Sequence, residues 1–587
     1  MGAREDHATR PIDARAALGS AVERETWQRI ACAPGLREQL GQIGELVEQA
    51  RTRPIAELPD DLYGEFERTG DRGAFESRYF QRRRALTALA VAALIDPDSG
   101  TELLADLVAA ICDEPYWALP AHVARDGLDP RETIDLFAAE TGSALAEITA
   151  LLADRLPHDL LRRVREEVIA RVIEPYERHS SWWEDSPSNW ASVCAGSVAL
   201  AAIQVCPEDR VRAQLPRLRA TLRRSLDGYG DDGVCVEGYG YWRYGFGYYL
   251  VAVEALDAVF GPDPNGEPGR AAEAARWPLR AFLSGRTLVT FADTWLEGTA
   301  DAGLLAGADQ RYGDVGLPTA DLTDTEVVDE CGRWALAVRS LCWHPQVTSR
   351  VTPTGTDQAP RWYPDAQWLV VPEGAHSPIG FAARAGHNGE PHNHNDLGSF
   401  VVARAGQLLV ADAGRGVYDR EYFGPRRYDN PAAGSHGHSV PLLDGVRQAE
   451  GPSAAAEVLG AELDGEGERV TVDLTAAYPH PALTRLVRRV ERRGEEVTVT
   501  DALTATEPIA MTQRFITLVA PNIENGVVHI VAGAARAELR YDPEASVTTG
   551  AFPVGRGSFP IAVHHVDIGL PAATEIEHTV RVSTYSV

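Results

Sequence analysis

The run G-H-N-G-E-P-H-N-H-N-D-L-G-S-F spans Gly386–Phe400, is followed by V-A-D-A-G-R-G at Val410–Gly416, and ends in G-S-H-G-H-S-V-P-L-L-D-G at Gly434–Gly445. Five of the chain's 16 histidines lie between the first and the last of these residues. Imidazoles gather in this way to hold a metal or to move protons, because histidine is the commonest metal ligand and titrates near neutrality. We therefore expect a functional site in this stretch, on short strands joined by polar loops.

Three side chains of this stretch form a candidate metal site, namely His394, Asp412 and His438. Alternation along an extended segment places His392 and His394 on one side, and a hairpin brings Asp412 back beside them. Two imidazoles and a carboxylate make a reasonable Zn²⁺ set in which water fills the fourth position. His436 competes with His438 for the third protein ligand, and the spacing leaves that choice open.

Length and composition limit the class of protein. With 587 residues the chain is too long for one ordinary core, so at least two domains are expected. Its apolar share of 44% and charged share of 24% are typical of a soluble globular protein. The formal net charge is −29 and no basic block is present, which argues against a nucleic-acid partner.

The chain has no lysine, so all 56 cations are arginines. This excludes Schiff-base chemistry and a P-loop lysine, whereas arginine suits carboxylate and sulfate groups well because its planar fork binds them bidentately. The seven cysteines show no C-x-x-C spacing, which predicts neither a thiolate metal site nor a disulfide framework.

No targeting or membrane segment is evident. The N-terminus lacks an apolar signal core, and the longest apolar run, about Ala85 to Ile95, is too short to span a bilayer. A cytoplasmic protein without a membrane partner is expected, and the sequence leaves a homodimer open.

The first half of the chain is predicted to be helical. Apolar residues recur at spacings of three and four, and short Pro, Gly and Asp breaks separate the periodic segments. Consecutive helices with short links pack as antiparallel pairs, so an α/α toroid, an incomplete barrel, is expected. The segments are 43–50, 85–94, 103–112, 136–152, 160–172, 193–205 and 248–260.

From about Gln367 the apolar period changes to two. Many short β-type runs with close turns indicate an antiparallel β-sandwich. We therefore predict an all-helical domain over residues 1–345 and a β-sandwich domain over residues 346–587, joined in the Pro- and Thr-rich stretch Pro345–Pro360. The predicted strands include 368–371, 381–384, 399–402, 408–410, 469–472 and 496–500.

The helical half carries three candidate sets of functional side chains. Aromatic, carboxylate and amide groups stand together in Ser181–Trp190, as in many sugar-binding clefts. The loop Asp232–Gly245 holds four glycines and three tyrosines, a composition unlike a helix core. Glu237 with Glu184 or Asp185 is a third set, a candidate carboxylate pair for hydrolysis.

Several of these motifs, taken in order, resemble the heparinase II/III-like polysaccharide lyases. H-N-H-N-D-L-G-S-F is similar to that family's H-N-D-x-G-S-F segment, and V-A-D-A-G is similar to its strand with the metal Asp. E-Y-F-G-P-R-R-Y with the later S-H-G-H-S-V-P-L-L-D-G resembles the following family stretch. In the helical half, N-W-A-S-V-C-A-G resembles a helix start, and D-G-V-C-V-E-G-Y-G-Y-W resembles a loop of the family.

The resemblance implies a helical toroid joined to a β-sandwich, with a cleft for a uronate polysaccharide between them. By position it implies that Tyr241 and His392 are catalytic and that Asn189 neutralises the uronate carboxylate. It also implies one structural Zn²⁺ held by His394, Asp412 and His438. The side chains expected to contact substrate are Trp183, Glu237, Tyr244 and Arg427.

The chemistry of these residue types agrees with β-elimination. Cleaving the bond at C4 of a uronate requires removal of the C5 proton, which is acidic only when the adjacent carboxylate is neutralised. An amide such as Asn189 can neutralise it without titrating, while Tyr241 and His392 share the acid and base roles. Arg415, Arg420, Arg426 and Arg427 could supply the local positive field that the whole chain lacks.

Three other functions remain open at this stage. One is a glycoside hydrolase on an α/α toroid, using Glu237 with Glu184 or Asp185. Another is an eliminase that acts on a small intracellular glycoside. The third is a non-catalytic carbohydrate-binding protein. The glycan itself, glycosaminoglycan-like or alginate-like, is not determined by the sequence.

Overall fold

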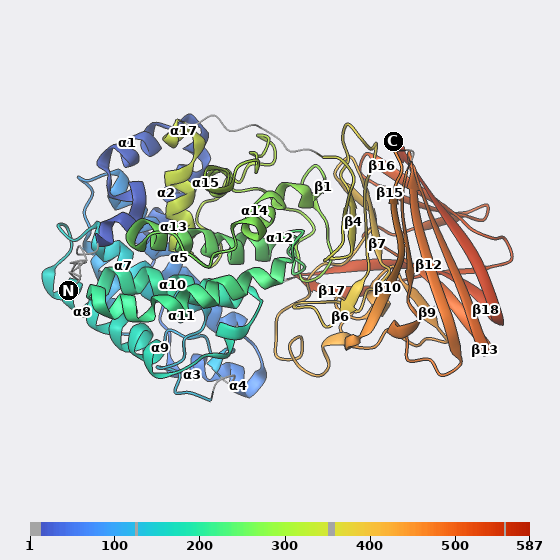
Figure 1. Ribbon diagram of the computed structural model, residues 1–587, viewed down its shortest axis with the longest axis horizontal. Helices are drawn as coiled ribbons and strands as arrows, with labels where there is room; N and C mark the ends of the chain where they lie inside the picture. The colour runs from blue at the N-terminus through green and yellow to red at the C-terminus, as the bar shows by residue number, and fades with distance from the viewer. Residues whose placement is uncertain (1–12, 124–126, 350–357, 466, 557–558) are drawn as a thin grey trace, which may run out of the picture.

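Two regions of different secondary structure lie side by side in the computed structural model, which describes residues 13–123, 127–349, 358–465, 467–556 and 559–587. Figure 1 shows helices on one side and long antiparallel strands on the other. The predicted order, a helical α/α toroid followed by a β-sandwich, is confirmed. All seven predicted helical segments lie in helices, although 160–172 continues from an α-helix into a π-helical turn, η4 (Ile169–Ile173).

The α-helices share the toroid and are α1 (Arg24–Cys32), α2 (Arg37–Thr52), α3 (Asp60–Tyr63), α4 (Glu65–Thr69), α5 (Gly73–Ile95), α6 (Glu102–Cys112), α7 (Leu136–Leu151), α8 (His158–Val168), α9 (Glu174–Arg178), α10 (Asn189–Val205), α11 (Glu208–Leu226), α12 (Tyr239–Tyr241), α13 (Gly247–Phe260), α14 (Pro268–Arg276), α15 (Ala302–Tyr312), α16 (Trp334–Trp343) and α17 (Pro345–Thr348). A second π-helical turn, η7 (Trp242–Phe246), joins α12 to α13.

The strands form two large antiparallel sheets. The five-stranded sheet has the order β3 (Arg361–Tyr363), β4 (Trp368–Val371), β5 (Gly380–Arg384), β7 (Phe400–Arg404), β8 (Gln407–Val410). The larger sheet has the order β14 (Asn522–Glu524), β15 (Val527–Ala532), β16 (Ala535–Arg540), β18 (Phe559–Ser586), β13 (Glu496–Thr517), β12 (Leu483–Arg493), β11 (Glu468–Asp473), β10 (Gly451–Leu463), β6 (Gly386–Asn388). Two more strands pair with it, β17 (Ser546–Arg556) with β18 and β9 (Pro441–Leu443) with β13.

The five-stranded sheet is buried on both faces, which explains why its strands are continuously apolar. Trp368 and Val370 of β4 pack into the core of the helical half, whereas Leu369 and Val371 pack into the core between the two sheets. Successive side chains of a strand point to opposite faces, so each face of β4 contributes two residues to a different core. Burying a large apolar side chain contributes roughly 1.5–3 kcal/mol, so this sheet joins the two regions firmly.

The expectation that the first half is all-helical is wrong. The region before residue 345 is not all-helical, because a hairpin of β1 (Phe282–Ser284) and β2 (Thr287–Leu288) interrupts it. This hairpin contacts the five-stranded region, since the carbonyl of Leu283 accepts a hydrogen bond from the backbone N–H of Glu373 at 2.7 Å. Strands of two or three residues have too few positions to show a period. The predicted junction, Pro345–Pro360, includes residues 350–357, which lie outside the described part of the chain.

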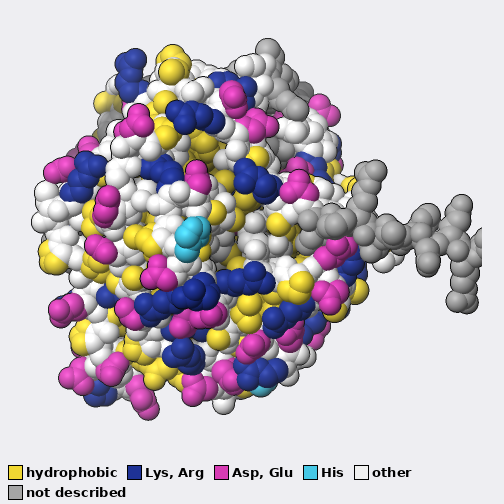
Figure 2. Space-filling view, turned by 90° about the vertical axis from the view of Figure 1, so that its left-hand side faces the viewer, with side chains coloured by type: hydrophobic (Ala, Val, Ile, Leu, Met, Phe, Trp, Pro, Cys, Tyr) yellow, Lys and Arg dark blue, Asp and Glu magenta, His cyan; other side chains and the backbone are white. Residues whose placement is uncertain are grey.

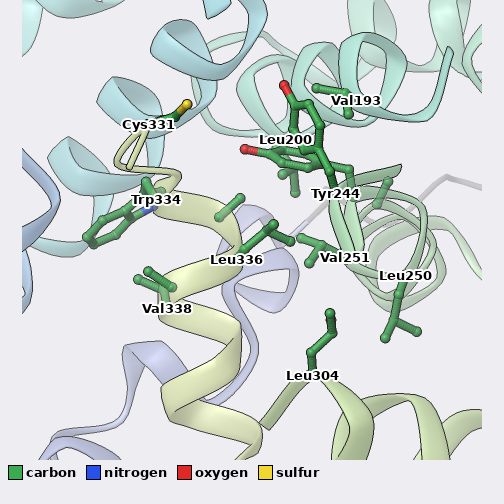
Figure 3. Close-up of a cluster of buried hydrophobic side chains, with 14 of the residues drawn as sticks. Val193, Leu200, Tyr244, Leu250, Val251, Leu304, Cys331, Trp334, Leu336 and Val338 are labelled. Carbon is green, nitrogen blue, oxygen red and sulfur yellow. The ribbon is translucent and has the colours of Figure 1, made fainter. Parts of the chain in front are cut away.

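The core of the toroid forms where helices from distant parts of the sequence meet. Figure 3 shows Val193 and Leu200 of α10 facing Val251 of α13 and Leu336 of α16. A buried ion pair adds to this packing, because the guanidinium of Arg339 donates hydrogen bonds of 2.5 and 2.6 Å to Glu147 of α7. Apolar packing and this charge pair together hold α7, α10, α13 and α16 around one centre.

Charges of both signs alternate on the outer face of the helical half. In Figure 2, dark-blue arginines and magenta carboxylates lie interspersed over this face, with small apolar areas between them. Binders of nucleic acid instead gather positive charge on one face. None of the helices within the described ranges combines the length and the apolar character needed to cross a bilayer.

Candidate active site and metal cluster

A cleft of about 1060 Å³ lies between the helical half and the loops of the β half. Its helical wall includes Asn189, Trp190 and Tyr241, and its β wall includes His392 and Arg427. Clefts of roughly 300–1000 Å³ are the usual size for sites that bury a small ligand. This cleft is therefore large enough for more than one sugar unit.

Tyr241 and His392 meet across this cleft. Their rings stack with centroids 4.3 Å apart and an angle of 30° between their planes. The Tyr241 hydroxyl forms a hydrogen bond of 2.6 Å with the hydroxyl of Tyr418, on the β side. Burial, together with the negative charge of Asp293, raises the pKa of the Tyr241 hydroxyl above its usual value. The structure thus brings together the two residues that the sequence proposed for proton transfer.

The backbone at both residues departs from regular structure. Tyr241 ends α12 and enters the π-helical turn η7, and π-helical turns occur frequently at functional sites. His392 has a φ of 54°, which is uncommon for a residue other than glycine. The predicted extended segment at His392–His394 is therefore wrong, because a left-handed residue breaks the alternation. The two imidazoles nevertheless come together, through a shared carboxylate.

That carboxylate is Asp293, which the sequence analysis missed. Its Oδ2 lies 2.9 Å from Nδ1 of His392, and its Oδ1 lies 3.0 Å from Nε2 of His394. It also accepts hydrogen bonds from the Tyr422 hydroxyl and from the Arg427 guanidinium. Burial alone would raise the pKa of Asp293, but the hydrogen bonds from both histidines and the charge of Arg427 hold it well below its usual value. The only sequence signal is a carboxylate within the apolar run 288–295.

Asn189 lies at the start of α10 and lines the cleft. Its carboxamide oxygen is buried and accepts no hydrogen bond from the described residues. Gly245 of η7 allows η7 to pack closely against α10 here, because a Cβ on Gly245 would lie 2.9 Å from the Cβ of Asn189. Asn189 therefore brings an uncharged amide to the wall of the cleft.

The four side chains predicted to contact substrate do not share one location. Tyr244 and Arg427 line the cleft. The structure does not bring Trp183 there, because its ring is fully buried and its indole N–H donates to the carbonyl of Ile134 at 2.9 Å. Glu237 is buried behind the cleft wall, with Oε2 3.5 Å from Nε2 of His392. In place of Trp183, the tryptophans that line the cleft are Trp182, Trp190 and Trp295.

The three predicted metal ligands lie together with a fourth residue, Asp396, which was not predicted from the sequence. His394, Asp396, Asp412 and His438 are all buried, and their ligand atoms lie within 4.8 Å of one another. Nδ1 of His394 has no hydrogen-bond partner among the described residues, which is unusual for a buried imidazole and fits a metal ligand. Two imidazole nitrogens and carboxylate oxygens are a common donor set for Zn²⁺.

The geometry decides between the two candidate histidines. Nδ1 of His438 lies 2.8 Å from Oδ2 of Asp412, within the cluster. Burial lowers the pKa of His438, but the Asp412 carboxylate outweighs burial and raises it. His436 lies outside the cluster, and burial together with the charge of Arg447 lowers its pKa to about 4. Of the two histidines that the spacing left open, His438 is the one that lies in the cluster.

The loops of the β half that carry this cluster lie in a region that is similar to a known protein family. Residues 356–556 match the family model described as heparinase II/III-like, C-terminal. The β half carries a heparinase II/III-like region. The resemblance is thus confirmed for the motifs within residues 356–556, which include the loops with His392, His394, Asp412 and His438. No curated protein sequence matches the chain.

Solved structures share the fold of the whole chain. A mutant of the heparan sulfate lyase HepC from Pedobacter heparinus has a TM-score of 0.61 and 13% identity, with 93% of this chain and 83% of that chain covered. A heparinase III structure has a TM-score of 0.61 and 11% identity over 94% and 92%. A chondroitin AC lyase from Streptomyces coelicolor A3, in complex with chondroitin sulphate, has a TM-score of 0.54 and 12% identity over 96% and 82%. The fold of the heparinase II/III-like region and the helical half together is therefore that of these lyases.

Proposed function

We propose that this chain is a polysaccharide lyase, a carbon–oxygen lyase that cleaves a uronate-containing glycan by β-elimination and leaves an unsaturated uronate. The observation that carries the proposal is the stacked pair of Tyr241 and His392 in a large cleft, with the carboxamide of Asn189 in the same cleft. The glycan would be glycosaminoglycan-like or alginate-like, since both kinds carry the uronate that this chemistry requires.

Asn189 would stabilise the charge that develops during the reaction. Removal of the C5 proton turns the uronate carboxylate into an enolate, and donors aimed at that charge lower the barrier. The Asn189 amide can donate to the carboxylate without changing its own charge. The aromatic and arginine lining of the cleft supports the binding of sugar rings that carry acidic groups.

His392 and Tyr241 would divide the two proton transfers. Asp293 accepts a hydrogen bond from Nδ1 of His392, so Nε2 carries the lone pair and can take the C5 proton. The raised pKa of Tyr241 keeps its hydroxyl protonated, so Tyr241 can donate a proton to the leaving O4. The proton taken from C5 then resides on the imidazole, and the C4–O4 bond breaks as the C4–C5 double bond forms.

We further propose that the metal in the cluster is a structural Zn²⁺. His394, Asp412 and His438 would hold it, with Asp396 as a further carboxylate nearby. When bound, the ion would cross-link three loops. It would also stabilise the folded state, because the free energy of metal binding adds to the free energy of folding. His394 also contacts Asp293, so the cluster would help to fix the carboxylate that orients His392.

The hydrolase alternative has less support. Glu184 is engaged with Arg217 through hydrogen bonds of 2.5 and 2.6 Å, and it caps the turn at Ser181. Neither Glu184 nor Asp185 lines the cleft, and Glu237 lies behind its wall. A hydrolase requires two carboxylates that reach the scissile bond.

Two substitutions separate these functions. Tyr241→Phe removes one hydroxyl and should lower turnover by roughly two to four orders of magnitude, the usual effect of losing a positioned acid. Glu237→Gln should leave a measurable fraction of the activity, because Glu237 takes no direct part in elimination. The assay follows the ultraviolet absorbance of the unsaturated product on a panel of uronate oligosaccharides. An active Tyr241→Phe variant, an inactive Glu237→Gln variant and a saturated product would together refute the lyase proposal in favour of hydrolysis.

A further inference from the structure

One arginine of the cleft differs from the others in its hydrogen-bonding partners. Four of the cleft arginines are engaged, namely Arg72 with Glu76, Arg333 with Asp329, Arg427 with Asp293, and Arg420 with the carbonyls of Phe66 and Glu67. For Arg415, no carboxylate or carbonyl in the described part of the chain accepts a hydrogen bond from the guanidinium. A cation without an acceptor in a cleft is available to an anionic ligand.

Aromatic rings hold this guanidinium in place. Its central carbon lies 3.6 Å from the centroid of the Trp295 ring and 5.1 Å from that of Tyr418. The backbone N–H of Arg415 donates to the carbonyl of Thr294 at 3.1 Å, which keeps the loop of Arg415 beside Trp295. Stacking uses the faces of a guanidinium and leaves its in-plane N–H donors free. The free donors match the planar or tetrahedral arrangement of oxygen atoms in a carboxylate or a sulfate.

The position of Arg415 connects it to the proposed reaction centre. Tyr418, one of the rings that contact Arg415, forms the hydrogen bond of 2.6 Å with the hydroxyl of Tyr241. Trp295 has 40% of its surface exposed and lines the same cleft, so one side of the stacked pair faces the space for a ligand. An anion bound at Arg415 would therefore lie close to the proposed reaction centre. Because Asn189 is assigned to the carboxylate of the reacting uronate, this anion would be a second acidic group of the substrate.

The charge balance of the cleft favours such an anion. Its lining includes five arginines and four carboxylates, whereas the whole chain has a formal net charge of −29. Because the chain as a whole repels polyanions, a local cation is needed to attract an acidic substrate. Two of the carboxylates in the lining already face other arginines, with Glu76 paired to Arg72 and Asp293 paired to Arg427.

We propose that Arg415, held over the ring of Trp295, binds a second oxyanion of the substrate, a carboxylate or sulfate on the sugar next to the cleaved uronate. This inference rests on the proposed lyase function and deepens it, because it names an acidic neighbouring sugar as part of the recognised substrate. Asn189 would bind the carboxylate of the reacting uronate, and Arg415 would bind the second acidic group.

The test compares Arg415→Gln with a matched control, Arg426→Gln. Arg426 lies on the same loop region, has its side chain 69% exposed, pairs with Glu421 and does not line the cleft. Each variant is assayed on oligosaccharides with the same cleavable uronate and a neighbouring sugar that is carboxylated, sulfated or neutral. Arg415→Gln should lower kcat/KM about 10–100-fold on one or both acidic forms and leave the neutral form nearly unchanged, as loss of a hydrogen bond to a charged group predicts. The form that loses more identifies the oxyanion.

Equal losses on acidic and neutral forms would overturn the proposal and give Arg415 a purely structural role in supporting Trp295. An absence of any loss would also overturn it. Calorimetric binding of short acidic and neutral fragments of the same glycans keeps this result separate from the proposed reaction. If the wild-type protein cleaves none of the oligosaccharides, the lyase proposal fails. In that case, wild-type binding that prefers acidic fragments, lost in Arg415→Gln and kept in Arg426→Gln, would still support an oxyanion site.

Discussion

Asp293 connects the two chemical centres of the molecule. Its two carboxylate oxygens lie against His392 and His394, so one side chain orients the proposed base and also contacts the metal cluster. Histidines, Tyr241 and Asn189 could be selected from the sequence because they stand in recognisable motifs. Asp293 could not, because it lies 99 residues from His392 along the chain, and only the folded chain brings the two together.

At this residue, Asp293→Asn should lower kcat by roughly two to four orders of magnitude, with a much smaller change in KM. An amide presents one oxygen and one NH₂ group, so it cannot accept hydrogen bonds from both histidines. His392 would lose the partner that keeps its Nε2 unprotonated. Steady-state kinetics check the prediction, with metal content measured alongside because His394 shares Asp293. A variant with raised KM and unchanged kcat would show that Asp293 acts on substrate binding instead.

The secondary-structure elements differ in how much of them could be predicted. Apolar segments with spacings of three and four gave seven helices, because each extends over two or more helical turns. The elements that carry Tyr241 are short, with α12 of three residues followed by the five-residue turn η7, and neither has a period to detect. The hairpin β1–β2 was missed for the same reason. The site therefore depends on elements too short for pattern analysis.

Glycine positions test the packing of two helices that were not predicted from the sequence, α15 and α16. A Cβ on Gly303 of α15 would lie 1.8 Å from the backbone carbonyl oxygen of Ser340 in α16, so these helices require glycine for their close approach. Gly303→Ala should reduce the free energy of unfolding by about 1–3 kcal/mol or more, the usual cost of overpacking. Urea denaturation with circular dichroism measures this change.

Gly44→Ala is the matched control, because a Cβ at this exposed position of α2 meets no atom within 4 Å. That substitution should leave stability unchanged or raise it by about 0.4–1 kcal/mol, since alanine restricts the unfolded chain. Equal destabilisation by both substitutions would contradict the close packing of α15 and α16.

For the whole molecule, the proposed chemistry requires both halves. Asn189 and Tyr241 come from the helices, whereas His392 and Arg415 come from loops of the β half. The order of the halves followed from the change of period at about Gln367. Their contact was expected only from the family resemblance, because the periodicity of a sequence carries no information on docking. The division at residues 345 and 346 and the catalytic roles remain predictions. The metal cluster also links the two halves, because its ligands come from three separate loops and one of these ligands, His394, contacts Asp293 of the helical half.

Removal of the metal should therefore lower the stability of the whole molecule. Purified protein should contain about one Zn²⁺ per chain, and chelation should lower the melting temperature by several degrees, because the ion stabilises only the folded state. His438→Asn should lose the metal and melt early even without chelator. His436→Asn is the matched control, since His436 lies two residues away but outside the cluster, and it should keep both metal and stability. Elemental analysis and thermal melts measure both properties. A metal-free protein whose melting is unchanged by His438→Asn would refute the structural metal site and leave the buried His438–Asp412 hydrogen bond as an ordinary polar contact of the core.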